Sequence, residues 1–216
     1  MLPYVGDNYE SPKHKKLLLV GESCYMPNGS TIHHDVDLWY GKDINFWKEL
    51  DDDELKCCSI HGARYWKCNP FDKKIDSAVR EAFPDIGDNA FNEMASYNYF
   101  LRPADEGSFK KFCTKRDCEM SARVFCNLLE ILKPELIVFA SQLVKNCVEG
   151  DFPKYCKGYL WDYTSKHKMH YIFTRHPSRE MWWNTAKEAI IHDVDYFQGL
   201  TSKQFFIKYL KENWWI

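Results

Sequence analysis

Two short stretches of the sequence bring together polar side chains that could do chemistry. Residues 21–25 read Gly-Glu-Ser-Cys-Tyr directly after an apolar run, and either the Glu22 carboxylate or the Ser23 hydroxyl could act there. Residues 174–178 read Thr-Arg-His-Pro-Ser after another apolar run, and they place His176 where the chain is expected to leave a sheet. We favour a functional His176 over a histidine that is merely exposed at a strand-to-helix turn.

A third polar side chain, Asn98, interrupts the aromatic segment at residues 97–100. A buried amide needs hydrogen-bond partners, and its one acceptor and two donors suit the edge of a planar heterocycle such as a pyrimidine. The alternative is an asparagine that bonds to its own backbone.

Four β-type runs are expected to position these groups, at residues 16–20, 97–101, 136–140 and 170–174. The first, third and fourth are rich in Leu, Val, Ile and Phe, as expected of strands that are buried on both faces of a parallel sheet. Helical patterns and end signals predict helices over residues 117–133, 179–196 and 202–211, with further candidates at 45–50, 72–83 and 141–148.

Strands that alternate with helices imply right-handed crossovers. We therefore expect an α/β fold with three layers, α/β/α, around a central four-stranded parallel sheet. Residues 1–216 contain no repeat and no linker-like stretch, which indicates a single domain. Ligands of such folds bind at the carboxyl ends of the strands, where Glu22, Asn98 and His176 are expected.

The bulk composition limits the class of protein. With 216 residues, 45% of them hydrophobic, the chain can bury a substantial core. The net charge of -2 means that any contact with nucleic acid depends on a local basic patch. The polar residues 1–16 and the absence of any apolar run of about 18 residues predict a cytoplasmic protein with no membrane partner. The nine cysteines, an odd number, are expected to be reduced there.

We expect no metal ion and no other cofactor. Two groups, neither with two C-x-x-C pairs, have side chains that could bind a metal: Cys57, Cys58 and Cys68 with His61, and Cys113 with Cys118. Residues 33–37, His-His-Asp-Val-Asp, are interpreted as a polar loop because contiguous ligands rarely converge on one ion.

Taken together, these residues resemble the uracil-DNA glycosylase superfamily over roughly residues 16–189. Gly21 and Glu22 match the opening of the Gly-Glu-Ala-Pro-Gly motif of the four-type family, which is closest in layout. Tyr25 matches the tyrosine of the Gly-Gln-Asp-Pro-Tyr-His motif of the classical family. Asn98 and the His-Pro-Ser motif at His176 follow in the same order. The resemblance implies a uracil-DNA glycosylase-like fold in a monomer.

The resemblance also implies an enzyme of base excision repair. It would hydrolyse the N-glycosidic bond of uracil, or of a related deaminated base, after the nucleotide is flipped out of DNA. The implied catalytic residues are Glu22, which would activate the attacking water, and His176, which would donate to the departing base. The implied base-binding residues are Asn98, which would read the base edge, with Tyr25 and Ser23. The implied DNA contacts are Arg175, Ser178 and Arg179, with Met181 and Trp182 as a wedge in the vacated stack.

The sequence departs from the superfamily at several positions. Ser23 stands where the classical family has its water-activating aspartate. Arg179 replaces the second proline of the classical His-Pro-Ser-Pro motif. No N-terminal cysteines correspond to the iron-sulfur ligands of the four-type family. The aromatic side chain that would stack on the flipped base is left open between Trp39, Phe46 and Trp47.

Two other functions remain open from the sequence. A superfamily member can keep the pocket and bind a nucleic acid or nucleobase without cleaving it, although such a binder has no need of the Glu22 carboxylate. A serine hydrolase would use Ser23 and His176 with an acid such as Asp162. Tyr25, however, occupies the position where the turn that carries a nucleophilic serine needs a second glycine.

Overall fold

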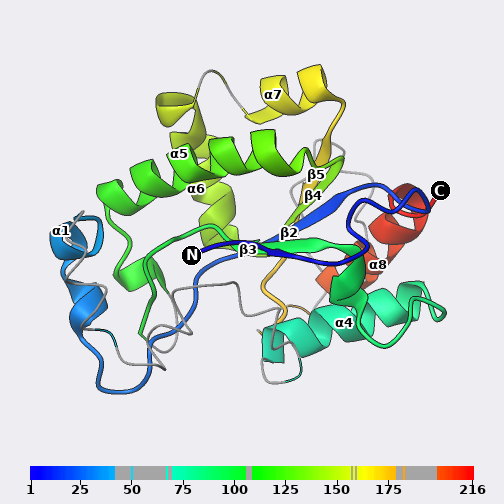
Figure 1. Ribbon diagram of the computed structural model, residues 1–216, viewed down its shortest axis with the longest axis horizontal. Helices are drawn as coiled ribbons and strands as arrows, with labels where there is room; N and C mark the ends of the chain where they lie inside the picture. The colour runs from blue at the N-terminus through cyan, green and yellow to red at the C-terminus, as the bar shows by residue number, and fades with distance from the viewer. Residues whose placement is uncertain are drawn as a thin grey trace.

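A five-stranded sheet forms the centre of the computed structural model, which describes residues 1–41, 50, 67, 70–105, 109–156, 158, 160–178, 182 and 199–216 (Figure 1). The strands, in the spatial order β1-β3-β2-β4-β5, are β1 (Tyr4–Val5), β2 (Leu17–Gly21), β3 (Ala95–Asn98), β4 (Leu136–Phe139) and β5 (His170–Phe173). β2 pairs in parallel with both β3 and β4, and β4 pairs in parallel with β5. The short β1 pairs antiparallel with β3, which makes the sheet mixed.

The predicted α/β class is confirmed, and the expectation of a purely parallel sheet of four strands is corrected. Each of the four predicted runs overlaps one of the strands β2 to β5. The additional strand, β1, is two residues long and therefore carries no periodicity that a sequence pattern could detect. Its residues Tyr4 and Val5 align with Ser96 and Ala95 of β3.

Helices cover both faces of the sheet (Figure 1). They are α1 (Val36–Trp39), α4 (Pro70–Ala82), α5 (Lys115–Leu132), α6 (Gln142–Tyr155), α7 (Leu160–His167) and α8 (Ser202–Asn213), with short 3₁₀ turns η1 (Ile32–His34), η3 (Ala90–Glu93) and η4 (Phe109–Lys111). No helix in the described part of the chain has the length and apolar composition needed to cross a membrane.

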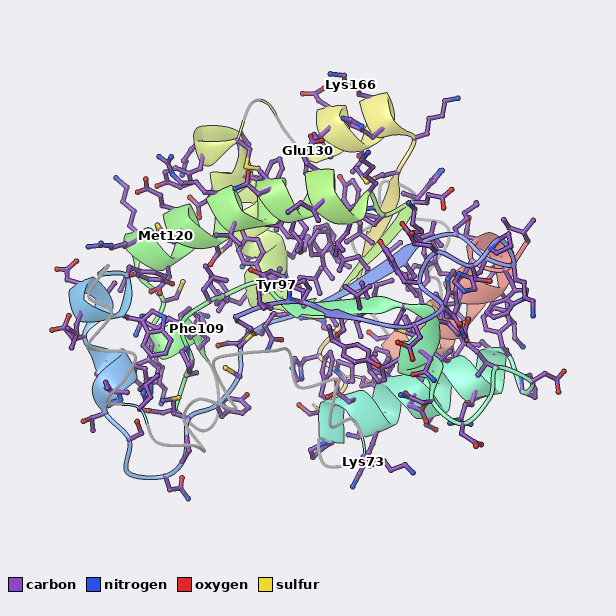
Figure 2. The ribbon with its side chains drawn as sticks, viewed as in Figure 1. Lys73, Tyr97, Phe109, Met120, Glu130 and Lys166 are labelled. Atoms are coloured by element: carbon purple, nitrogen blue, oxygen red, sulfur yellow. A yellow bond between two sulfur atoms is a disulfide. The ribbon has the colours of Figure 1, made fainter. Side chains whose placement is uncertain are left out.

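Successive side chains of β2 point to opposite faces of the sheet and enter two separate cores. Leu17 and Leu19 pack with α4 and α8 on one face. Leu18 and Val20 pack with α5 and α6 on the other. Figure 2 shows side chains filling both layers, with Tyr97 of β3 belonging to the core beneath α5. β2 is therefore buried on both faces, as its run of Leu and Val predicts.

The helix ends follow local capping rules. Thr114 and Asp117 form a reciprocal capping box at the start of α5, and Lys133 ends that helix in the left-handed conformation. The predictions at 117–133, 202–211, 72–83 and 141–148 correspond to α5, α8, α4 and α6. α7 was not predicted. The predictions at 45–50 and 179–196 lie outside the described residues, apart from Leu50 and Trp182.

A disulfide joins Cys126 in α5 to Cys156 at the end of α6. The expectation of reduced thiols throughout the chain is therefore wrong for this pair. The other described cysteines, which form no disulfide, are Cys24, Cys113, Cys118 and Cys147.

Candidate functional site

Three side chains from distant parts of the chain lie along the carboxyl edge of the sheet. Gly21 and Asn98 are paired residues at the ends of β2 and β3, and a Cβ atom added to Gly21 would lie 2.5 Å from Asn98 Oδ1. The same point lies 3.8 Å from Phe71 Cζ, in the first turn of α4. The centroid of the Phe71 ring is 4.9 Å from that of His176, which follows β5. We call Asn98, Phe71 and His176 the edge group.

The absence of a side chain at Gly21 leaves the space that the Asn98 amide occupies. Asn98 is buried, with 8% of its surface exposed, so its amide is held within the fold. Contacts below about 3 Å between a Cβ and a polar atom force one of the two to move. Gly21 and Asn98 are thus structurally coupled.

Gly21→Ala is expected to lower the free energy of unfolding by about 1 to 3 kcal/mol, because the new methyl group must displace the Asn98 side chain. Urea denaturation measures this loss. Gly150→Ala is the matched control, because Gly150 lies in α6 with open space around its Cα, and it should be neutral or slightly stabilising. Removing the amide as well, in Gly21→Ala/Asn98→Ala, should cancel part of the loss. Strictly additive effects would show that the two residues are not coupled.

The hydrogen bonds of His176 define which ring nitrogen carries the proton. The backbone N–H of Ser178 lies 3.3 Å from His176 Nδ1, and Ser178 Oγ lies 2.7 Å from the same nitrogen. A backbone N–H can only donate, so Nδ1 is an acceptor and the neutral imidazole carries its proton on Nε2. His176 can therefore act as a neutral hydrogen-bond donor.

Glu22 lies at the same edge of the sheet, but its carboxylate is directed toward the other face. Glu22 Oε2 accepts from Ser141 Oγ at 2.5 Å, and Oε1 accepts from the backbone N–H of Phe109 at 3.2 Å. Ser141 caps α6, which covers the face opposite α4. The structure thus places Phe71 close to the Gly21–Asn98 pair and in contact with His176, and it anchors Glu22 on other partners.

Ser23 and Tyr25 lie on a segment that pairs with the chain after β3. Ser23 Oγ donates to the backbone carbonyl of Arg102 at 2.9 Å. Tyr25 forms an isolated parallel bridge with Ala104, and its side chain is exposed. The hydroxyl of Ser23 therefore holds the loop, and its hydrogen bonding gives no support to a triad with His176 and Asp162.

A buried ion pair that the sequence did not reveal fixes the loops behind this edge. Arg102, with 1% of its surface exposed, donates from Nε to Asp117 Oδ1 at 2.8 Å and from Nη2 to Oδ2 at 2.6 Å. Its Nη1 donates to the carbonyl of His33 at 2.8 Å, and its Nη2 to that of Phe112 at 2.5 Å. Burial alone would raise the pKa of the Asp117 carboxyl, but hydrogen bonds from Arg102 and Thr114 outweigh burial and lower it.

The segment that we interpreted as a polar loop contains a buried histidine. His33 is fully buried, and its Nε2 lies 2.7 Å from Asp105 Oδ1. His34 Nε2 lies 3.0 Å from the same oxygen. Burial lowers the pKa of His33, whereas the pKa of Asp105 is lowered mainly by its hydrogen bond with His34. His33 and His34 therefore share one carboxylate, and our prediction that contiguous residues here do not converge on a metal ion stays a prediction.

The expected DNA contacts differ in their placement. Arg175 is partly exposed next to His176, and Ser178 is exposed while it holds the His176 ring. Trp182 is fully buried and packs against Phe206, so the expectation that it inserts into DNA is corrected. Arg179 and Met181 lie outside the described residues.

Phe71 is the aromatic residue of the edge group, and it was not among the residues predicted to stack on a base. Trp39 is buried against Met26 in a separate small cluster, while Phe46 and Trp47 lie outside the described residues. The only local signal for Phe71 is that it directly follows Pro70, a residue favoured in the first turn of a helix. Its contact with His176 depends on how α4 packs on the sheet.

Next to Phe71, the Asp72 carboxyl is completely buried, and in the described structure neither of its oxygens has a hydrogen-bond partner. Burial raises the pKa of Asp72 to about 7. The folded protein thus binds this proton more tightly than the unfolded chain does. The contribution of this proton to stability is fully present at pH values below the ordinary pKa of an aspartate. It is lost as the pH rises through 7.

Asp72→Asn is accordingly expected to raise the free energy of unfolding at pH 8 by at most about 4 kcal/mol. The gain at pH 4 should be much smaller. Urea denaturation at both pH values measures the difference. Asp85→Asn, at an exposed position beyond α4, serves as the control and should show no such pH dependence. An equal effect of Asp72→Asn at both pH values would mean that the buried carboxyl keeps an ordinary pKa.

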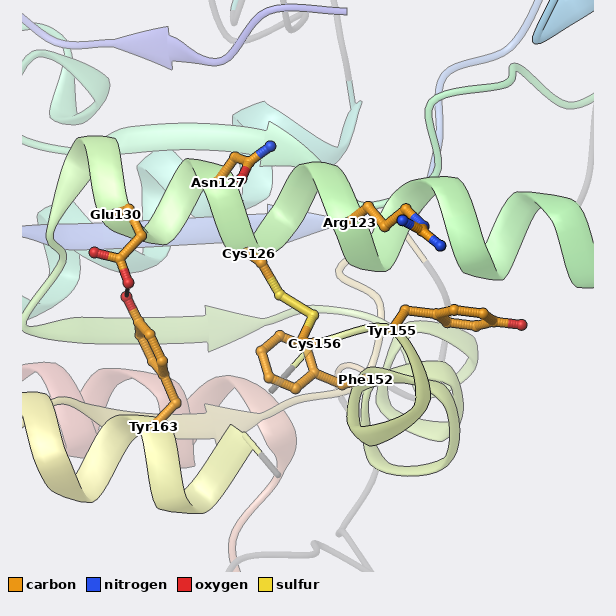
Figure 3. Close-up of a pocket in the computed structure, with 8 residues that line it drawn as sticks. All are labelled: Arg123, Cys126, Asn127, Glu130, Phe152, Tyr155, Cys156 and Tyr163. Carbon is orange, nitrogen blue, oxygen red and sulfur yellow. Dashed lines mark hydrogen bonds between the residues drawn. A yellow bond between two sulfur atoms is a disulfide. The ribbon is translucent and has the colours of Figure 1, made fainter. Parts of the chain in front are cut away.

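A surface pocket of about 470 Å³ lies beside α5, α6 and α7, away from the edge group (Figure 3). The disulfide forms part of its wall, and Tyr163 donates to Glu130 Oε1 at 2.7 Å across its rim. Its lining residues are Arg123, Cys126, Asn127, Glu130, Phe152, Tyr155, Cys156 and Tyr163. Because these include no predicted site residue, the pocket does not support the predicted chemistry.

No protein-family model and no curated protein sequence matches the chain. We therefore infer a function from the residues themselves and from their geometry.

Proposed function

We propose that this protein is a DNA glycosylase that hydrolyses the N-glycosidic bond of uracil or a related deaminated base. The observation that supports the proposal most is the edge group, which combines an amide, an aromatic ring and a neutral imidazole at the carboxyl end of the sheet. A flipped base is recognised by hydrogen bonds to its edge and by stacking on an aromatic face. The proposal includes a uracil-DNA glycosylase-like core formed by β3, β2, β4 and β5, with β1 as an addition.

Each member of the edge group has a distinct role in the proposal. The Asn98 amide bonds to the N–H and carbonyl edge of the pyrimidine, and the Phe71 ring stacks on its face. His176 donates from Nε2 to a base oxygen. As the bond between C1′ and the base nitrogen breaks, its electron pair leaves with the base, and the donated hydrogen bond stabilises the charge that collects on that oxygen.

Activation of the attacking water is assigned to Glu22 on the basis of the resemblance alone. Water supplies the hydroxyl group to C1′, and a carboxylate that faces the sugar would take up its proton. The two hydrogen bonds from Ser141 and Phe109 hold the carboxylate at the end of β2. For Glu22 to serve as the base, one oxygen has to exchange its present partner for the water.

The engagement of both Glu22 oxygens favours a second candidate, a protein that binds a nucleobase or a nucleic acid without cleaving it. Such a protein keeps the edge group and uses Glu22 only to cap the segment before α5 and the start of α6. Both candidates bind a base at the edge group. They differ in whether the N-glycosidic bond is then cleaved.

Incubation with single- and double-stranded oligonucleotides that contain uracil, followed by alkali, tests the proposal. Strand breaks at the uracil position would show that abasic sites had been formed. Parallel reactions with hypoxanthine and xanthine cover the related deaminated bases. No breaks with any of the three, together with measurable binding of the same oligonucleotides, would reject the glycosylase in favour of the binder.

A further inference from the structure

Three cysteine thiols converge between the start of α5 and the middle of α6. Cys113 lies just before α5, Cys118 lies in its first turn, and Cys147 lies on α6. Cys118 Sγ is 3.6 Å from Cys113 Sγ and 3.6 Å from Cys147 Sγ, and all three sulfur atoms lie within 4.8 Å of one another. Cys118 and Cys147 are buried, and Cys113 is partly buried.

The two separations of 3.6 Å are close to those in a tetrahedral zinc site. With Zn–S bonds of about 2.3 Å, neighbouring sulfur ligands lie about 3.8 Å apart. A disulfide would need the sulfur atoms at about 2.05 Å, so the three thiols are close to one another without being joined. Their convergence was not evident from the sequence, because only Cys113 and Cys118 are close in the chain.

A carboxylate lies on the same helix as Cys147, outside the group of three sulfur atoms. Asp151 follows Cys147 by one helical turn and projects from the same face of α6. The Asp151 side chain is 24% exposed and also binds Lys154 Nζ at 2.9 Å. The fourth side of the cluster is therefore polar and open to solvent, which gives an ion a route of entry.

We infer that Cys113, Cys118 and Cys147 bind one Zn²⁺ ion as thiolates, and that the Asp151 carboxylate turns from Lys154 to supply the fourth ligand. This proposal departs from our expectation that the protein binds no metal. Binding releases the thiol protons to solvent and involves no change of oxidation state.

The zinc site would have a structural role. The disulfide between Cys126 and Cys156 already joins α5 to the end of α6, about two turns further along both helices. The ion would join the same two helices at a second point and tie Cys113 to them. Cys113 belongs to the segment that supplies the Phe112 carbonyl to Arg102 and the Phe109 N–H to Glu22. Zinc would thus stabilise the loop behind the candidate site.

Metal titration of the full chain tests the inference. The background carries Ser at Cys57, Cys58, Cys68, Cys126 and Cys156, so that Cys24 is the one other cysteine left in the reduced protein. Zinc content of the reduced protein should reach one ion per chain, and Co²⁺ should give thiolate-to-metal charge-transfer absorption. Cys118→Ser and, separately, Cys147→Ser should weaken Co²⁺ affinity by on the order of 100-fold or more, whereas Cys24→Ser should leave it unchanged. Asp151→Asn should weaken it less and alter the cobalt spectrum.

Circular dichroism of each variant without metal distinguishes loss of a ligand from loss of the fold. The inference is overturned if the folded, reduced background protein binds no stoichiometric Zn²⁺. It is overturned equally if Cys118→Ser binds Co²⁺ as the background does, or if the protein as isolated contains a disulfide between two of the three thiols. An unchanged spectrum and affinity in Asp151→Asn would remove Asp151 from the ligand set.

Discussion

Asn98→Ala is expected to lower kcat/KM on uracil-containing DNA by about 30- to 900-fold, which corresponds to the 2 to 4 kcal/mol of transition-state stabilisation typical of one well-placed donor. The amide is buried and lies over Gly21, so it is held in place before the base arrives. His176→Ala should cause a loss of the same size, because its Nε2–H is positioned by the contact of Ser178 with Nδ1. Single-turnover base release measures both effects.

Matched controls separate these roles from a general loss of structure. Asn127→Ala removes an amide from the exposed surface of α5, and His167→Ala removes an exposed imidazole from α7. Both should retain the wild-type rate. A wild-type rate in Asn98→Ala or in His176→Ala would remove that residue from the proposed mechanism, whatever the activity of the other variant.

Arg102→Met is expected to lower the free energy of unfolding by about 3 to 5 kcal/mol, because it leaves the Asp117 carboxylate buried without its main counter-charge. The guanidinium also holds the carbonyls of His33 and Phe112, so the variant leaves two more buried acceptors without this donor. Urea denaturation measures the loss. Arg102 does not contact the edge group in the described structure, so the effect concerns stability and not chemistry.

The ion pair of Arg123 with Glu119 provides the comparison for Arg102. It lies on the surface of α5, with 58% and 36% of the two side chains exposed, and Arg123→Met should cost less than about 1 kcal/mol. Equal losses for Arg102→Met and Arg123→Met would contradict the view that the buried pair organises the loops behind the candidate site.

Local sequence patterns were enough to locate the strands β2, β4 and β5 and the helix α5. Their signals are runs of Leu, Val and Ile, helical periodicity and a capping residue, and these act over a few residues. The same patterns placed His176 just after a strand. Asn98 was predicted near the start of the run at 97–101, whereas it is the last residue of β3. The alternation of side chains along β2 could also have shown that Gly21 and Glu22 point to opposite faces, but we did not apply it beyond the end of the strand.

The remaining features depend on contacts between residues far apart in the chain. Phe71 meets His176 only because α4 packs beside the end of β5. Cys147 joins Cys113 and Cys118 only because α6 lies against α5. The burial of Arg102 and its bond to Asp117 likewise follow from the path of the loops. No short pattern in the sequence encodes these approaches.

The central claim is that Asn98 and His176 bind one base between them, beside the Phe71 ring. NMR titration of ¹⁵N-labelled protein tests this most directly, with a single-stranded oligonucleotide that carries uracil on a 2′-fluorinated sugar to slow cleavage. The signals of Asn98 Nδ2 and His176 Nε2, assigned with the alanine variants, should shift together with one midpoint, and an oligonucleotide without uracil should leave them in place. If either signal stays unchanged when the protein is saturated with the uracil oligonucleotide, the edge group is not a base-binding site.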